Sequence, residues 1–253
     1  MAESARAQGV SNICVLAFKG ETNPVIVRYA DELRWIKVGR LRDFLETLKS
    51  FEADVAVMAG QITPTALFRL RPDKAMLKLL SGLDKRNAET IFGAIGDEMK
   101  NIGVELKPAS LFMQQTMPEP GILTAREPDR RETRDIELGL KVAKTTSGLD
   151  IGQTVVVKEG TILAVEAFEG TDKTIRRAGK LGGPGGVVVK VAKRGHDMRF
   201  DIPVIGMRTI KTFKKARVSA LAVEAGRTIL LEREKIIAAA DELNLAITAV
   251  AVI

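Results

Sequence analysis

Short apolar runs alternate with amphipathic helical patterns through the first part of this 253-residue chain. Asn12–Phe18 has the pattern of a strand, Arg40–Phe51 that of an amphipathic helix, and Asp54–Ala59 that of a buried strand that ends at Gly60. Such alternation is typical of βαβ units, which build a parallel sheet. Because ligands of these sheets lie beyond the carboxyl ends of the strands, the loop from Gly60 to Pro64 is a candidate part of a binding site.

The boundary between two domains is predicted from a change of pattern. Helical patterns at Asp73–Ser81 and Asn87–Ile102 and a strand at Val104–Lys107 continue the first part. The densely charged stretch Thr124–Arg134 contains Pro128 and has the character of a connection. We therefore expect an α/β chain with a Rossmann-like, parallel-sheet domain over 1–125 and a second α/β domain over 126–253.

The second part carries strands that suit a mixed sheet. A helix at Asp135–Thr146 precedes two strands, Thr154–Lys158 and Thr161–Ala167, in the manner of a hairpin. The remaining expected elements follow in order: a short basic helix, the turn Leu181–Gly186, the strand Val187–Ala192, the strands Ala220–Val223 and Thr228–Leu231, and the helix Glu232–Leu243.

Positive charge is concentrated in one segment. The chain carries a net charge of +7, and the segment from Lys173 to Arg217 holds thirteen lysines and arginines against two acids. This excess indicates a surface for phosphates or for an anionic membrane, with a solvated basic face as the alternative. An aromatic content of 4% leaves few rings for stacking on bases, so nucleic acid is not an expected partner.

The sequence also bears on the compartment. Cys14 is the single cysteine, so an internal disulfide is excluded and the cytoplasm is the expected location. The first nine residues lack the apolar stretch of a secretory signal. No apolar run approaches the roughly 20 residues that span a bilayer, so any membrane contact should be peripheral.

The segment His196–Pro203 carries the acids of greatest interest. If it is extended, a period of two places Asp197, Arg199 and Asp201 on one face. Two carboxylates beside an arginine can hold Mg²⁺ or Mn²⁺ while the guanidinium binds a phosphate oxygen. A surface strand with a local ion pair is the alternative. His196, the single histidine, is more simply incidental, and no Cys/His cluster predicts a zinc site.

Two further groups of residues have alternative interpretations. Lys190 interrupts an apolar strand, where it would meet a phosphate or carboxylate, or pack its stem while its ammonium reaches water. Glu166 and Glu169 precede Gly170, after which Thr171 or Asp172 would cap a basic helix. These acids would bind metal or act as a general base, or would be solvated acids beside a helix cap, whose N-terminus after a glycine suits an anion.

An ordered set of motifs runs through the second part. It comprises Asp150–Gln153, Ala164–Asp172, Val189–Lys193, Asp197–Gly206 and Val223–Arg227, with weaker matches at Val38-Gly39, Ala59-Gly60 and Leu70–Asp73. In these motifs the chain resembles the UDP-2,3-diacylglucosamine pyrophosphatases of Gram-negative bacteria that lack the calcineurin-like enzyme for this step. Relative to that family the chain begins after an apolar strand and a Gly-rich loop, and Arg194, His196 and Met207 replace Pro, Gln and Pro.

The resemblance implies a reaction and a site. It implies Mg²⁺- or Mn²⁺-dependent hydrolysis in lipid A biosynthesis, with a substrate between the two domains, at the cytoplasmic face of the inner membrane; a homodimer is compatible with it. The aspartate essential in the family corresponds to Asp201. With the residue patterns, this defines catalytic candidates Asp201, Asp197 and Glu166; substrate-binding candidates Gly60, Gln153, Gly170, Thr171, Arg177, Lys190, Lys193, Arg199, Glu224 and Gly226; and metal ligands Asp201, Glu169 and Asp172. A non-catalytic binder of lipid or nucleotide-sugar is the alternative.

Overall fold

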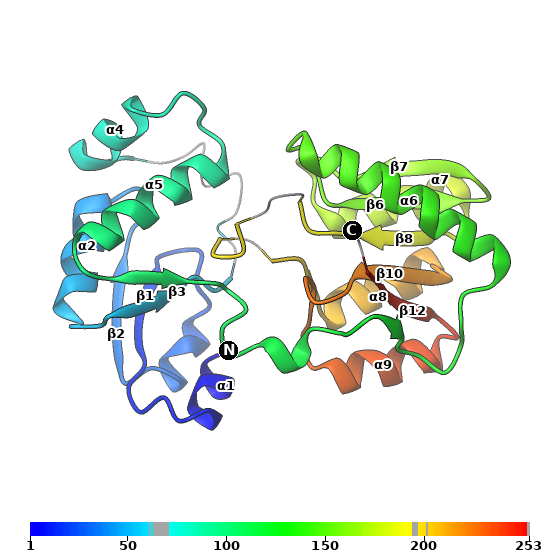
Figure 1. Cartoon of the computed structure of the whole chain (residues 1–253), viewed down its shortest axis with the longest axis horizontal. Coiled ribbons are helices and arrows are strands. Elements are labelled where there is room, and N and C mark those ends of the chain that lie inside the picture. The colour runs from blue at the N-terminus through cyan, green and yellow to red at the C-terminus, as the bar shows by residue number, and fades with distance from the viewer. Residues whose placement is uncertain (61, 63–70, 194–196, 201, 252–253) are drawn as a thin grey trace. The chain divides into compact units, whose positions relative to one another are not determined.

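The chain folds as two compact units (Figure 1). The computed structural model describes residues 1–60, 62, 71–193, 197–200 and 202–251. The first unit comprises Met1–Phe112 and Asp197–Asp201, and the second comprises Met113–His196 and Ile202–Ile253. The chain therefore leaves the second unit after residue 196, contributes five residues to the first, and returns.

The first unit has parallel strand pairs, as the sequence predicts. Strand β1 pairs with β2, and β3 pairs with β4, so the described strands form two sheets of two strands each. The elements of this unit are α1 (Ala2–Ala7), β1 (Cys14–Phe18), the 3₁₀ helix η1 (Pro24–Arg28), β2 (Glu32–Ile36), α2 (Leu41–Ser50), β3 (Val55–Val57), α4 (Lys74–Ser81), α5 (Ala88–Asn101) and β4 (Glu105–Lys107).

The core of the first unit lies where α2 and α5 meet β4. Its buried members are Leu48, Phe51, Met99, Val104 and Leu106. The amphipathic helix predicted at 40–51 is confirmed as α2, whose apolar stripe faces this core. The strand predicted as buried over 54–59 is shorter, and Val55 is 46% exposed, so its burial was predicted wrongly.

The second unit is built on one mixed sheet of six strands. Their order is β5-β12-β10-β8-β6-β7, in which β8, β10 and β12 run parallel. This confirms the predicted mixed sheet and the β6–β7 hairpin. The elements are the 3₁₀ helix η2 (Gln114–Thr116), β5 (Gly121–Ile122), α6 (Arg130–Gly148), β6 (Thr154–Lys158), β7 (Thr161–Val165), α7 (Thr171–Gly182), β8 (Val187–Lys190), β9 (Val204–Ile205), α8 (Met207–Ala216), β10 (Ala220–Glu224), β11 (Ile229–Leu230), α9 (Arg233–Glu242) and β12 (Ala246–Val250).

Helices cover both faces of this sheet. Successive residues of a strand point to opposite faces, and in β6 Val155 and Val157 join one cluster while Val156 joins the other. Helix α6 packs on the first face, and α7, α8 and α9 pack on the second. The strands are therefore apolar on both sides, as expected of a covered sheet.

The charged stretch 124–134 is not only a connection. Helix α6 begins at Arg130, five residues before the predicted start, because Asp129 and Glu132 form a capping box. Glu132 is buried and accepts two hydrogen bonds from the Arg126 guanidinium, at 2.8 and 3.0 Å. Upstream of it, Gly121–Ile122 pairs with β12, and the second unit begins at Met113.

Candidate active site

The candidate active site lies at one edge of the six-stranded sheet. Strands β7, β8 and β10 all end there, since β6 is antiparallel to both β7 and β8, and β8 is parallel to β10. Lys190 ends β8, Glu224 ends β10, and Glu166 follows β7. Polar side chains are thus gathered where the apolar strands stop.

Three predicted site residues form one hydrogen-bonded chain. The ammonium of Lys190, 8% exposed, donates to the Thr171 hydroxyl at 2.7 Å. That hydroxyl donates to Oε1 of Glu166 at 2.9 Å. The other carboxylate oxygen of Glu166 is buried and has no hydrogen-bond partner among the described residues. Lys190 therefore meets a polar network and does not extend its ammonium into water, so that alternative is wrong.

The position of Glu166 depends on close backbone contact. A Cβ atom on Gly152 would lie 2.1 Å from the Glu166 carbonyl oxygen, so only glycine fits there. The Glu166 N–H donates to the Thr154 carbonyl at 2.8 Å, and the Gln153 carbonyl accepts from Val191 N at 3.0 Å. The Asp150–Gln153 motif thus packs against the residues that follow β7 and β8.

The start of α7 differs from the prediction in its cap. Gly170, with φ of 82°, is the N-cap residue, and no side chain caps the helix, so the prediction of Thr171 or Asp172 as N-cap is wrong. A glycine allows this left-handed conformation at little cost. Thr171 is instead engaged with Glu166 and Lys190.

The other acids of this segment pair with arginines. Glu169 contacts Arg177 at 2.6 Å, and Asp172 contacts Arg208 at 2.8 Å. The Arg177 hydrogen bond is the main cause that lowers the pKa of Glu169. Both acids therefore form ion pairs with arginines, and both arginines lie on the exposed side of their helices.

Glu224 lies in a separate network. Its Oε2 accepts from the Lys144 ammonium at 2.7 Å and from Ala192 N at 2.8 Å, and the Arg227 guanidinium lies 3.7 Å from Oε1. Glu224 is 2% exposed, so its carboxylate fixes the chain after β8 to α6. Lys144 was not among the predicted site residues, because nothing in the sequence distinguishes it from other cations of a helix.

Two remaining candidates lie near this network in the second unit. Lys193 contacts Asp150 at 2.6 Å. Gly226 has φ of 64° and donates its N–H to the Pro118 carbonyl at 2.9 Å. These contacts link the ends of β8 and β10 to neighbouring loops.

The segment 197–200 is a turn in the first unit, not the predicted extended strand. Phe200 N donates to the Asp197 carbonyl at 3.1 Å, and the Arg199 guanidinium contacts the Asp197 carboxylate at 2.6 Å. This hydrogen bond is the main cause that raises the pKa of Arg199. The Phe200 ring stacks on Phe92, with ring centroids 6.2 Å apart, which anchors the turn.

The remaining predicted residues belong to the first unit or lie outside the described residues. Asp197, Arg199 and the exposed Gly60 belong to the first unit. Asp201, His196 and most of the 60–64 loop lie outside the described residues. Within the described part, no group of three His, Cys, Asp or Glu residues is arranged to hold a metal ion. The metal ligands Asp201, Glu169 and Asp172 stay a prediction.

The second unit is thus an α/β unit with a buried lysine, a half-buried threonine and a half-buried glutamate at the carboxyl edge of its sheet, an arrangement suited to an anionic ligand. Each of the two units matches a domain of a known protein family. The LpxI N-terminal domain family matches residues 1–116, and the LpxI C-terminal domain family matches residues 119–248. The chain belongs to the LpxI family.

A named relative extends this comparison. The UDP-2,3-diacylglucosamine pyrophosphatase LpxI of Caulobacter vibrioides is 33% identical over 245 residues, which cover 91% of this chain and 86% of that protein. The family resemblance drawn from the sequence motifs is therefore confirmed. No helix in the described ranges is long and apolar enough to cross a membrane.

Proposed function

We propose that this protein hydrolyses the pyrophosphate of UDP-2,3-diacylglucosamine in lipid A biosynthesis. The observation that carries the proposal is the match to the named LpxI relative along 91% of the chain. The products would be UMP and 2,3-diacylglucosamine 1-phosphate. Water would attack the phosphorus nearer the glucosamine, and the bond from that phosphorus to the bridging oxygen would break, so that UMP leaves with this oxygen.

Such a reaction needs positive charge near the diphosphate and a base for the water. Lys190 supplies a fixed ammonium, held by Thr171. Among the acidic candidates, Asp197, Glu169 and Asp172 each contact an arginine. Glu166 has no arginine partner and has a buried oxygen without a hydrogen-bond partner among the described residues, so we assign it the role of general base. Asp201 is proposed as the essential carboxylate.

The metal requirement is a separate part of the proposal. Mg²⁺ or Mn²⁺ would neutralise charge on the diphosphate. Glu169 and Asp172 are tied to arginines, and the described acids form no three-ligand group, so they do not fit a metal without Asp201. Turnover should be lost on chelation with EDTA and return with either ion; full turnover in EDTA would remove the metal from the proposal.

The decisive experiment is release of UMP from the lipid substrate. Purified protein with Mg²⁺ and, separately, Mn²⁺ should release UMP, and Asp201→Ala should abolish turnover while substrate still binds. Folded protein that binds the substrate yet releases no UMP would instead indicate a non-catalytic binder. Unchanged turnover in Asp201→Ala would disprove its role.

The role of Glu166 has its own test. Glu166→Gln keeps an oxygen for the Thr171 hydroxyl and removes the basic carboxylate, so kcat should fall by roughly 10²–10⁴-fold with little change in KM. Glu137→Gln, at an exposed position of α6, is the matched control and should leave kcat unchanged. A Glu166→Gln protein with wild-type kcat would exclude Glu166 as the base.

We also propose that the basic face of α7 and α8 contacts the anionic inner-membrane surface. The two helices pack closely, with Ala216 directly against Gly179, and the apolar Leu181 at the end of α7 is 68% exposed. Each cation near an anionic bilayer contributes about 1 kcal/mol. The exposed cations of this face that have no ion pair within the described chain are Lys173, Arg176, Lys180, Lys211, Lys214 and Lys215.

Vesicle flotation tests this contact. The protein should float with phosphatidylglycerol vesicles and remain behind with phosphatidylcholine vesicles, and reversing Lys211, Lys214 and Lys215 to Glu should abolish flotation. Equal loss in a control with three exposed lysines of the first unit reversed would show that only net charge matters. That control carries Lys49→Glu, Lys78→Glu and Lys100→Glu.

A further inference from the structure

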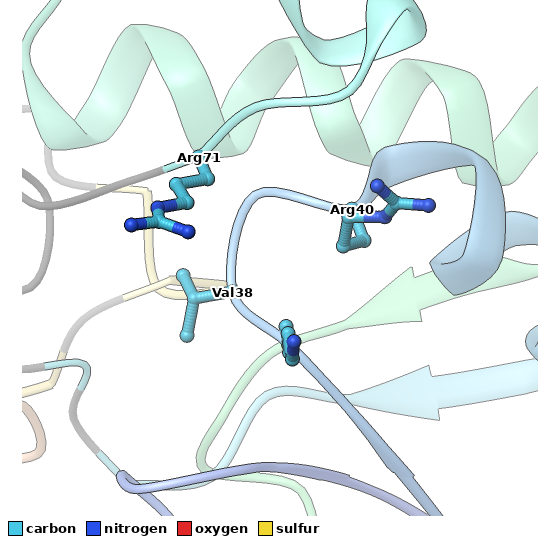
Figure 2. Close-up of a pocket in the computed structure, with 4 residues that line it drawn as sticks. Val38, Arg40 and Arg71 are labelled. Carbon is cyan, nitrogen blue, oxygen red and sulfur yellow. The ribbon is translucent and has the colours of Figure 1, made fainter.

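The first unit contains a pocket lined largely by cations. Its volume is about 290 Å³, and the described residues that line it are Lys37, Val38, Arg40 and Arg71 (Figure 2). No acid is among these lining residues. Figure 2 shows the Arg71 side chain directed from its own segment toward the turn that carries Val38.

The pocket lies beyond the end of a parallel strand. Strand β2, parallel to β1, ends at Ile36, and the turn 37–40 leads into α2. In parallel α/β sheets this is the edge where ligands bind. Arg71 enters from a second segment, two residues before Asp73, the N-cap residue of α4.

Asp73 ties the two segments together. Its Oδ1 accepts from Met76 N at 2.8 Å within α4, and its Oδ2 accepts from Arg42 N at 3.0 Å at the start of α2. Its own N–H donates to the Gly39 carbonyl at 3.1 Å. Burial acts to raise the pKa of Asp73, but the Met76 and Arg42 N–H groups and the charge of Arg40 outweigh it, and the pKa is lowered. The ionised carboxylate of Asp73 therefore holds together the two segments that line the pocket.

In the described part of the first unit, an acid pairs with one of the three cations that line the pocket. Arg40 contacts Asp43 at 3.1 Å. The Lys37 ammonium and the Arg71 guanidinium have no ion pair or hydrogen bond in the described part of the chain. Two cations that line one pocket repel each other, and an anion between them would relieve this repulsion. The α2 N-terminus adds little, because Asp73 already accepts from Arg42 N.

From these observations we propose that the pocket is a phosphoryl-binding site, with Lys37 and Arg71 as its principal ligands. A guanidinium and an ammonium suit the oxygens of a phosphate, which the guanidinium can contact through two N–H groups. The phosphoryl group has two potential sources, free inorganic phosphate or a nucleotide such as UMP. The proposal does not depend on the hydrolysis proposed above, since neither probe is turned over.

Titration calorimetry on the full chain tests the site with inorganic phosphate, UMP and uridine. We expect UMP to bind and uridine, which lacks the phosphate, not to bind. Arg71→Gln and Lys37→Gln should each weaken UMP binding by about tenfold or more, since a hydrogen bond to a charged group contributes roughly that factor. Both residues are exposed, so these variants should fold.

The control and the phosphate probe define the outcome. Lys49→Gln removes the same charge from an exposed position near the end of α2 and should bind UMP like the wild type. Binding of phosphate as well as UMP, with both weakened by Arg71→Gln, would indicate a general phosphate site, and binding of UMP alone a nucleotide site. The proposal is overturned if neither probe binds, if Arg71→Gln and Lys37→Gln bind normally, or if Lys49→Gln loses as much affinity. Loss of hydrolysis with intact, Arg71-dependent binding would refute only the proposed reaction.

Discussion

The two units differ in how they bury their residues. In the second unit, sheet residues such as Val157, Val189 and Leu221 are 0% exposed, and helices cover both faces. In the first unit, the members of the main cluster keep 2% to 8% of their surface exposed around strands of three residues. A deep core, whose residues are fully buried, can hold side chains rigidly. A unit with a shallow core, whose residues keep some exposure, depends more on the caps of its helices for its stability.

Their buried polar groups differ in the same way. Every charged or polar side chain that is buried in the described structure belongs to the second unit, including Glu132, Lys190 and Glu224. Burying such groups costs free energy unless they are paired. The second unit, with its deep core, can therefore keep charged groups in fixed positions, while the first unit presents cations at an exposed pocket.

The largest stability effect should come from the buried ion pair of the second unit. Glu132→Ala leaves the Arg126 guanidinium without its carboxylate and removes half of the α6 capping box, so it should lower the free energy of unfolding by about 3–5 kcal/mol. Urea unfolding followed by circular dichroism measures it. Glu137→Ala on the exposed face of α6 is the control. A loss below 1 kcal/mol would show that this buried pair is not what stabilises the unit.

The depth of the two cores can be compared with one pair of substitutions. Leu221→Ala in β10 and Leu48→Ala in α2 remove the same atoms, at 0% and 8% exposure. Leu-to-Ala changes cost about 2–5 kcal/mol, and more where the site cannot collapse. Leu221→Ala should fall in the upper half of this range and Leu48→Ala near its lower end. Equal losses would contradict the difference between the cores.

Capping should matter more in the first unit. Asp73→Ala removes acceptors from the first turns of α2 and α4, and should cost about 1–2 kcal/mol. Hydrogen exchange would show faster exchange of the amides of Met76 and Arg42, while the amides of α6 keep their protection. Ser81→Ala, at the exposed end of α4, is a control expected to have little effect.

The smallest effect is a difference in acid sensitivity. The folded-state pKa of Asp73 and that of Glu132 are both lowered. For Glu132, burial acts to raise the pKa, but the hydrogen bonds from Arg126 and from the Asp129 N–H outweigh this effect. The contribution of these two carboxylates to stability is therefore fully present above their unfolded-state pKa values of about 4, and it is lost as the pH falls through their lower folded-state pKa values. Stability measured from about pH 6 downward should decline, and less so in Asp73→Ala. An identical decline would exclude a contribution from Asp73.

Much of the fold was accessible from sequence patterns. Helices α2, α4 and α5 begin and end within a residue or two of the predicted limits, because periodic apolar residues and the caps Asp73 and Asn87 are local signals. The start of α6 was missed because the charged residues before it had the composition of a linker, and the capping box within them was overlooked. The 197–200 segment was misjudged because alternation alone does not distinguish a strand from a turn closed by its own Asp197 and Arg199.

Periodicity and ordered motifs are properties of the chain, so the α/β class, the family and the acids and cations from which a site could be built were all accessible from the amino-acid sequence. Which of these side chains meet depends on the tertiary structure. Lys190, Thr171 and Glu166 are joined because three strands end at one edge, and Lys144 and Glu224 are joined across 80 residues. Which side chains come within hydrogen-bonding distance depends on how strands order in a sheet, and that order arises from packing rather than from any local pattern.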